Sequence, residues 1–259
     1  FFFFFPPLFF DFMLVLLPIA GDDTTPEGEQ VNIYGNHVGS WNFAATAYLN
    51  QWKVKIYYEH YFDDHSQMFF QYGRWKDGHI GLEITFPKNR FIDTFVYEGL
   101  GTKDQTGPML YDSFWGEFEE QISAKDNYYN HYLYQGWQHW GMGIGNPLLP
   151  GPIYNKNGQI TFISNRVLAH HIGFCGSPCQ SLSYRMLLSY SRHWGTYDNP
   201  LNEIKKQFNS LFEVTYAPQQ LKGWSFTVSG AMDRGSMLGN NYGGMLVIRK
   251  QGIIKSGNK

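Results

Sequence analysis

Charged residues occupy 16% of the 259-residue sequence, against roughly 25% in typical soluble domains, and aromatic residues occupy 19%. The net charge of −2 gives no basic footprint, which excludes nucleic acid as an expected partner. The mean hydropathy of −0.37 excludes a bundle of membrane helices. Many aromatic residues and glycines with few charges are typical of a membrane β-barrel, whose outer face meets lipid and whose lumen meets water.

The first twenty residues, FFFFFPPLFFDFMLVLLPIA, are of low complexity and nearly all apolar. Pro6, Pro7, Asp11 and Pro18 argue against a single transmembrane helix. Two interpretations stay open: a remnant secretory leader or truncated start, and a lipid-facing piece of a preceding structure. With the polar stretch that follows, residues 1–30 are expected to form a leader and linker, and residues 31–259 a partial β-barrel domain.

Period-two alternation begins soon after residue 30 and indicates β-strands. About ten runs alternate, most of them close to the length of about nine to eleven residues with which a tilted strand crosses a bilayer. The clearest runs are Ser40–Leu49, Trp52–Glu59, Ile80–Phe86, Ser181–Tyr190, Phe212–Tyr216 and Trp224–Val228.

The second face of these runs distinguishes a barrel from a soluble sandwich. That face is mostly Ser, Thr, Gly and Tyr with isolated charges, whereas a sandwich exposes Lys and Glu to open solvent. Short turns (NQ, PKNR, CGSPCQ and PQQLKG) alternate with long connections at residues 63–77 and 99–158, as in outer-membrane barrels. The predicted fold is therefore all-β, an antiparallel transmembrane β-barrel with long outer loops, of which about ten strands are visible.

The segment YYEHYFDDHS holds the densest set of chemically capable side chains. Alternation places His60 on the lipid side with Trp52, and Glu59 and Tyr61 on the lumen side, so Glu59 and His60 cannot converge on one metal ion. The loop that follows is either a solvated turn or a metal or sugar contact, and its candidate residues are Asp63, Asp64 and His65.

Two further loops carry groups suited to a polysaccharide, since amides and charges bind hydroxyls and flat aromatic rings stack on sugars. Each loop also has a structural interpretation, as an ordinary glycine-bounded loop or as an aromatic girdle or lumen plug. Two arginines near the expected lumen, Arg166 and Arg185, are added to these loops. The candidate glycan-binding residues are then Lys103, Asp104, Gln105, Asn127, Tyr128, Tyr129, Trp137, Arg166 and Arg185.

No motif for catalysis, a metal or a cofactor emerges. The sequence has no GxSxG and no HExxH, and adjacent His170 and His171 would point to opposite faces of a strand. Lumen carboxylates such as Glu59, Glu83 and Glu98 would form a glycosidase pair only at a separation that sequence does not set. We therefore expect no enzyme activity and no cofactor.

The two cysteines, Cys175 and Cys179, lie in the segment CGSPC. This spacing allows a disulfide across a hairpin turn in an oxidising compartment, or two free thiols in a loop. A zinc site is disfavoured because no second pair completes four ligands.

An ordered set of motifs resembles the capsule assembly Wzi family of Bacteroidetes-type bacteria. These motifs are GNHVGSWNF, YYEHYFDDHSQMF, FVYEGLGTKDQTGP, DNYYNHYLYQGWQHWGMGIGNPL, NRVLAHHIGF and YSRHWGTY. The resemblance implies an outer-membrane barrel of roughly eighteen strands that binds capsular or exported polysaccharide at the cell surface, as a lectin-like protein and not an enzyme.

This chain would then correspond to the C-terminal half or more of such a barrel, and a monomer is expected. Its end, IRKQGIIKSGNK, departs from the terminal aromatic residue common in outer-membrane barrels. Two alternatives remain, a porin-like transport barrel and a soluble β-rich glycoside hydrolase.

Overall fold

The computed structural model describes residues 37–63, 77–89, 91–105, 125–131 and 135–252. It also describes the backbone of residues 109–111 and 121–123 and six single positions: Phe9, Phe12, Met13, Leu16, Asp23 and Met68. The predicted leader and linker lie outside the described residues apart from five of these positions.

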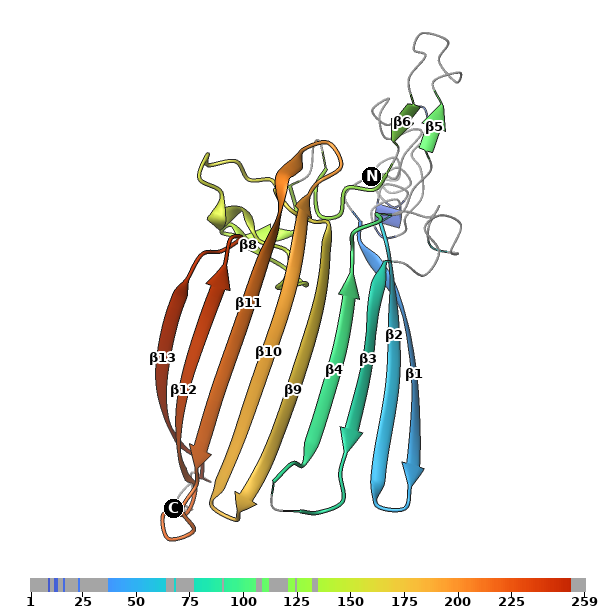
Figure 1. Ribbon diagram of the computed structural model, residues 1–259. Helices are drawn as coiled ribbons and strands as arrows, with labels where there is room; N and C mark the ends of the chain where they lie inside the picture. Colours follow the sequence, from blue (N-terminus) through green and yellow to red (C-terminus); the bar gives the residue numbers. More distant parts are fainter. Residues whose placement is uncertain are drawn as a thin grey trace, which may run out of the picture.

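The chain is all-β, as predicted, and its main element is a nine-stranded antiparallel sheet with the order β1-β2-β3-β4-β9-β10-β11-β12-β13 (Figure 1). Among the described residues β1 and β13 are unpaired edges, so the predicted barrel is not closed. The strands are β1 (Gly39–Leu49), β2 (Trp52–Phe62), β3 (Gly78–Thr85), β4 (Thr94–Gly101), β9 (Val167–Cys179), β10 (Leu182–Gly195), β11 (Pro200–Tyr216), β12 (Trp224–Gly235) and β13 (Asn241–Lys250).

The described part of the connection between β4 and β9 contains four short strands and a 3₁₀ helix. They are β5 (Met109–Tyr111), β6 (Gln121–Ser123), β7 (Gln138–His139), β8 (Met142–Gly143) and η2 (Pro152–Tyr154). Strands β5 and β6 pair with each other, as do β7 and β8. Within the described residues, no helix has the length and apolar character needed to cross a membrane.

The predicted difference in length between the connections at the two ends of the sheet is confirmed for only part of the sheet. We call the end that holds residues 50–51, 86–93, 180–181 and 217–223 the turn end, and the opposite end the loop end. Residues 63–77 and 102–166 form the long connections of the loop end, whereas residues 196–199 and 236–240 at the same end are short. Length asymmetry is thus confined to the first half of the sheet.

One face of the sheet, the apolar face, is lined by large hydrophobic side chains that remain exposed. Ile56, Phe212 and Leu246 are 54%, 51% and 65% exposed, and the ladder register aligns such residues across the strands: Ile56 pairs with Leu82, Leu82 with Tyr97 and Tyr97 with Ile172. Among the described residues no second sheet layer covers this face. In a soluble sandwich a second sheet would bury this face. Exposed apolar surface of this extent marks an interaction face.

The opposite face, the polar face, carries charged and hydroxyl side chains. Lys53 pairs with Glu83 at 3.4 Å and Arg185 with Glu213 at 3.3 Å, and Thr215 and Thr227 share a hydrogen bond of 2.8 Å. The only sizeable hydrophobic cluster in the described part of the chain lies at the loop end of this face, where the β4–β9 connection packs back on the strands. Its buried members are Leu100, Tyr129, Leu149, Phe162, Val167 and Ala169.

Candidate functional site

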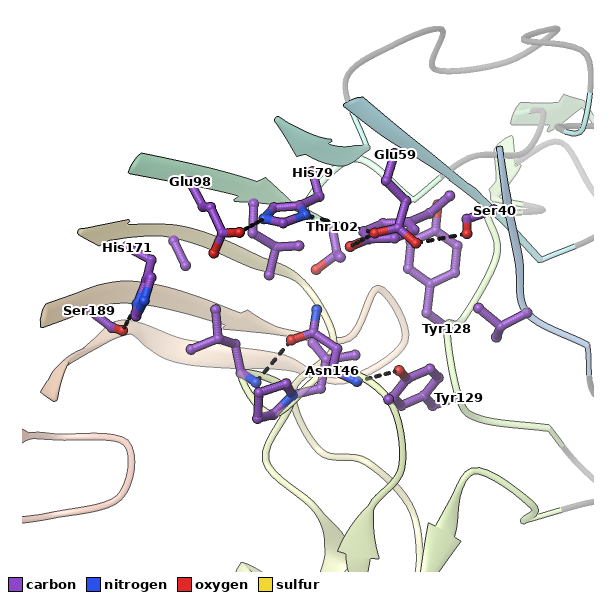
Figure 2. Close-up of a pocket in the computed structure, with 18 of the residues that line it drawn as sticks. Ser40, Glu59, His79, Glu98, Thr102, Tyr128, Tyr129, Asn146, His171 and Ser189 are labelled. Atoms are coloured by element: carbon purple, nitrogen blue, oxygen red, sulfur yellow. Dashed lines mark hydrogen bonds and ion pairs between the residues drawn. The ribbon is translucent and has the colours of Figure 1, made fainter. Parts of the chain in front are cut away.

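A cavity of about 620 Å³ lies at the loop end of the polar face, between the sheet and the returning β4–β9 connection (Figure 2). Strands β1 to β4, β9 and β10 form one wall, and residues 128–129 and 145–149 form the other. The polar side chains on its surface are Ser40, Glu59, Tyr61, His79, Glu98, Thr102, Tyr128, Tyr129, Asn146, His171 and Ser189.

His79 lies between two carboxylates in this wall. It is the register partner of Glu59 across β2 and β3, and Glu98 projects from the next strand. The distance from His79 Nδ1 to Glu59 Oε2 is 3.8 Å, and that from Nε2 to Glu98 Oε1 is 3.6 Å. Figure 2 shows the three side chains in a row along the wall.

Hydroxyl groups hold both carboxylates in place. Ser40 Oγ donates to Glu59 Oε1 at 2.8 Å, and Tyr61 OH lies 3.3 Å from Oε2. Tyr57 OH donates to Glu98 Oε1. The Tyr57 ring reaches Glu98 because it passes over Gly81, where an added Cβ would lie 2.0 Å from the ring.

The remainder of the sheet wall is a histidine–serine pair and an apolar patch. His171 Nδ1 lies 2.6 Å from Ser189 Oγ, whereas Leu100 and Ala169 are almost fully buried beside them. His170, the neighbour of His171, contacts Tyr97 on the apolar face at 2.8 Å. The prediction that the two histidines point to opposite faces is therefore confirmed.

The loop wall is fixed by Tyr129. Its OH accepts a hydrogen bond from the Asn146 N–H at 2.9 Å. Its ring stacks on Trp137 at 5.4 Å and meets Phe162 edge-on at 5.1 Å. Its backbone has φ 72°, an uncommon conformation for a non-glycine residue. Burial raises the pKa of Tyr129, and we conclude that its ring supports the loop from within the hydrophobic cluster.

Asp77 ties the loop to the start of β3. Its fully buried carboxylate accepts hydrogen bonds from Tyr128 OH at 2.9 Å and from the Asp104 N–H at 3.0 Å. Burial raises the pKa of Asp77 to about 6, although these two hydrogen bonds act in the opposite direction. Asp77 therefore holds together three segments that are distant in sequence.

The structure separates the predicted glycan-binding residues into groups. Glu59, Tyr61, Tyr128 and Tyr129 line the cavity, and Glu59 and Tyr61 lie on the face that alternation assigned to them. Trp137 lies behind Tyr129 as its stacking partner and is absent from the cavity surface. Asp63, half-buried, follows the end of β2, whereas Asp64 and His65 lie outside the described residues.

Five other predicted residues form a loop-anchoring network and do not line the cavity. Lys103 lies over the Trp194 ring at 5.1 Å, and Arg166 over the Tyr197 ring at 3.8 Å. Asp104 bonds through its backbone to Asp77 and Tyr197. Gln105, fully buried, donates to Asn165 at 2.7 Å, and Asn127 donates to Asp198 at 3.2 Å. Their polar groups serve the loop fold, because buried backbone and amide groups need partners.

The structure also places Arg185 and His60, and it corrects the disulfide that the spacing of CGSPC allowed. Arg185 lies on the polar face but pairs with Glu213 toward the turn end, away from the cavity. His60 shares the apolar-face register with Trp41 but is fully buried. Cys175 and Cys179 are free: both lie on strand β9 and do not face each other across a turn, and the extended backbone between them keeps them apart.

Sequence reasoning missed most of the cavity's chemistry. His79 and Asn146 were not candidates, and His171 was considered only for a metal shared with His170. Alternation places each of the strand residues on the polar face, but only the register between strands shows that Glu59, His79 and Glu98 meet. The described residues contain no group of three His, Cys, Asp or Glu side chains that could hold a metal ion.

Fold and site together define an all-β protein in which one sheet face is apolar and exposed and the other forms a loop-capped polar cavity. Comparisons of the chain with protein-family models, with curated proteins and with solved structures find no match.

Proposed function

We propose that the chain forms part of the wall of an outer-membrane β-barrel that binds capsular or exported polysaccharide at the cell surface without catalysing a reaction. The apolar face meets lipid, and the polar face holds the glycan in the loop-end cavity. The motif resemblance to the capsule assembly Wzi family supports the assignment to capsule assembly.

The dimensions of the apolar face support the membrane part of this proposal. On β10 the apolar-face residues run from Leu182 to Tyr190, with Arg192 as the first charged residue beyond them. This stretch is about 26 Å long at about 3.3 Å per residue, or about 20 Å along the normal for a tilt near 40°, close to the apolar band of about 25 Å in outer-membrane barrels. Tyr184 and Tyr190 lie near its two ends, where such barrels carry aromatic girdles.

The observation that carries the glycan part is the mixed lining of the cavity. Glu59, Glu98 and Asn146 offer oxygen atoms to sugar hydroxyls, and Pro147 and Leu148 offer an apolar patch to the C–H faces of a pyranose ring. The volume of about 620 Å³ lies within the range of about 300–1,000 Å³ of ligand pockets.

The binding test uses the full chain in detergent micelles and polysaccharide purified from the producing cell surface. Wild-type chain is expected to bind, and Glu59→Gln with Glu98→Gln is expected to weaken binding by about tenfold or more, because hydrogen bonds to charged groups contribute about 1.5–3 kcal/mol each. Glu213→Gln, on the same face outside the cavity, is the matched control. Equal binding by all three proteins would contradict the cavity assignment.

A glycoside hydrolase is the second candidate, favoured by the two carboxylates on either side of His79. Release of reducing ends from bound glycan would support it over the binding protein. A porin-like barrel is distinguished by conductance across a planar bilayer, since the loop residues 128–129 and 145–149, which cover the polar face, should restrict the current.

A further inference from the structure

The cavity contains acidic groups but, among the described residues that line it, neither lysine nor arginine. Glu59 and Glu98 are its carboxylates, and His79 and His171 are its only basic groups. With both histidines neutral the lining carries two negative charges, and even with both protonated it carries no net positive charge. Its electrostatic character is therefore anionic to neutral.

Four described cations on the polar face and at the loop end have other partners. Lys55 lies over the Tyr57 ring at 5.2 Å, and its row in the sheet register contains Val96, two residues before Glu98. Lys53 pairs with Glu83. At the loop end, Lys103 and Arg166 lie over the rings of Trp194 and Tyr197. None of these side chains lines the cavity.

The two carboxylates can also accept hydrogen bonds from a ligand. A carboxylate offers about four acceptor positions. Glu98 accepts a hydrogen bond from Tyr57, and Glu59 accepts hydrogen bonds from Ser40 and Tyr61. His79 lies at ion-pair distance from both carboxylates. Acceptor positions therefore remain on both residues, and sugar hydroxyl or ammonium groups would fill them, whereas an ionised sugar carboxylate or sulfate has no proton to donate.

We infer that the cavity selects uncharged or amino-bearing sugar residues and rejects uronic and sulfated ones. This inference rests on the proposed glycan-binding function and specifies its ligand class. An acidic sugar would bring a like charge close to Glu59 and Glu98 in a partly desolvated site whose described lining has no lysine or arginine to neutralise it. A neutral pyranose places its hydroxyls on the carboxylates and its C–H face on Pro147 and Leu148.

The experiment measures binding of the full chain in detergent micelles to three sets of oligosaccharides of equal length at pH 7 and low salt. The sets are glucose and galactose oligomers, glucosamine oligomers, and galacturonic acid oligomers, each in several linkages. Neutral or amino oligomers should bind at least about tenfold more tightly than uronic ones, a factor that one close like-charge contact readily exceeds.

Two variants assign the selectivity to the cavity. Glu98→Gln keeps the size of the side chain and an acceptor for Tyr57 but removes one charge. The preference for neutral or amino oligomers over uronic ones should therefore shrink severalfold. Glu213→Gln should leave the preference unchanged, because Glu213 pairs with Arg185 outside the cavity.

The outcomes separate this inference from the proposed function. Uronic oligomers that bind as tightly as neutral ones would overturn the inference and leave glycan binding standing. A preference that persists undiminished in Glu98→Gln would also overturn it, because the selectivity would then arise elsewhere. Failure of all three sets to bind would contradict the proposed function itself.

Discussion

The ring of Tyr57 lies directly over Gly81, and this contact makes Gly81→Ala a sensitive test of how the cavity wall is built. An added Cβ would lie 2.0 Å from Cζ and 2.5 Å from the hydroxyl oxygen of Tyr57. Ordinary van der Waals contact begins near 3.4 Å, so the ring must move by about 1.4 Å. That movement takes the hydroxyl away from Glu98.

The expected cost combines two terms. Overpacking costs about 1–3 kcal/mol, and loss of a hydrogen bond to a charged acceptor costs about 1.5–3 kcal/mol. We expect Gly81→Ala to lower the free energy of unfolding by about 3 kcal/mol, measured by urea denaturation in detergent micelles with tryptophan fluorescence. Gly243→Ala, at a polar-face position with no atom within 4 Å of the added Cβ, should cost little.

A double-mutant cycle identifies the mechanism. In a Tyr57→Ala background the ring is absent, so Gly81→Ala should be neutral or slightly stabilising, because alanine restricts the unfolded chain more than glycine does. If Gly81→Ala is as destabilising without the ring as with it, the cost does not arise from the Tyr57 contact and the reasoning fails.

Three further predictions follow from the same structure. First, the raised pKa of Asp77, about 6, means that the folded state binds a proton more tightly than the unfolded state does. The stabilising contribution of Asp77 is thus present below about pH 4 and lost as the pH rises through 6. The free energy of unfolding of the wild type relative to Asp77→Asn should therefore fall between about pH 4 and pH 6. A difference between the two proteins that stays constant over this interval would refute the prediction. Second, Leu246→Arg on the apolar face should cost about 2 kcal/mol or more in lipid vesicles, whereas the adjacent and similarly exposed Met245→Arg on the polar face should cost much less; equal costs would argue against lipid at the apolar face. Third, titration of the unfolded chain without reductant should give two thiols, since Cys175 and Cys179 are free; recovery of no thiol would show that they are bonded.

Alternation predicted the strands and their faces because residues two positions apart on a strand point to the same face of the sheet. Alternating apolar and polar residues therefore give one apolar and one polar face. Glu59 and Tyr61 lie on the polar face as expected, and the long connections after β2 and β4 lie where their length indicated. Prediction of CGSPC as a turn failed because β9 continues through Cys179 and the chain reverses at Gln180 and Ser181. Cysteine, glycine and proline in one segment suggested a turn, but strand β9 runs through them with an irregularity in its register with β10.

The cavity could not be assembled from the sequence because it depends on contacts between distant segments. Antiparallel register brings Glu59, His79 and Glu98 together, and no local pattern sets that register. Loop residues were harder still. Gln105, Asn127 and Arg166 have the polar side chains of a ligand loop, yet they satisfy the backbone and side chains of neighbouring loops. A polar loop residue and a ligand-binding residue look alike until the partners are known.

The central claim is that the apolar face of the sheet meets lipid while the polar face meets water. Spin labels on single cysteines at Met186, Leu187, Leu188, Ser189 and Tyr190 of β10, in a chain with both native cysteines replaced by serine and reconstituted in lipid vesicles, test it most directly. The labels at positions 186, 188 and 190 should be accessible to oxygen dissolved in lipid, and those at 187 and 189 to a water-soluble nickel complex. Equal accessibility to the nickel complex at all five positions would contradict the account.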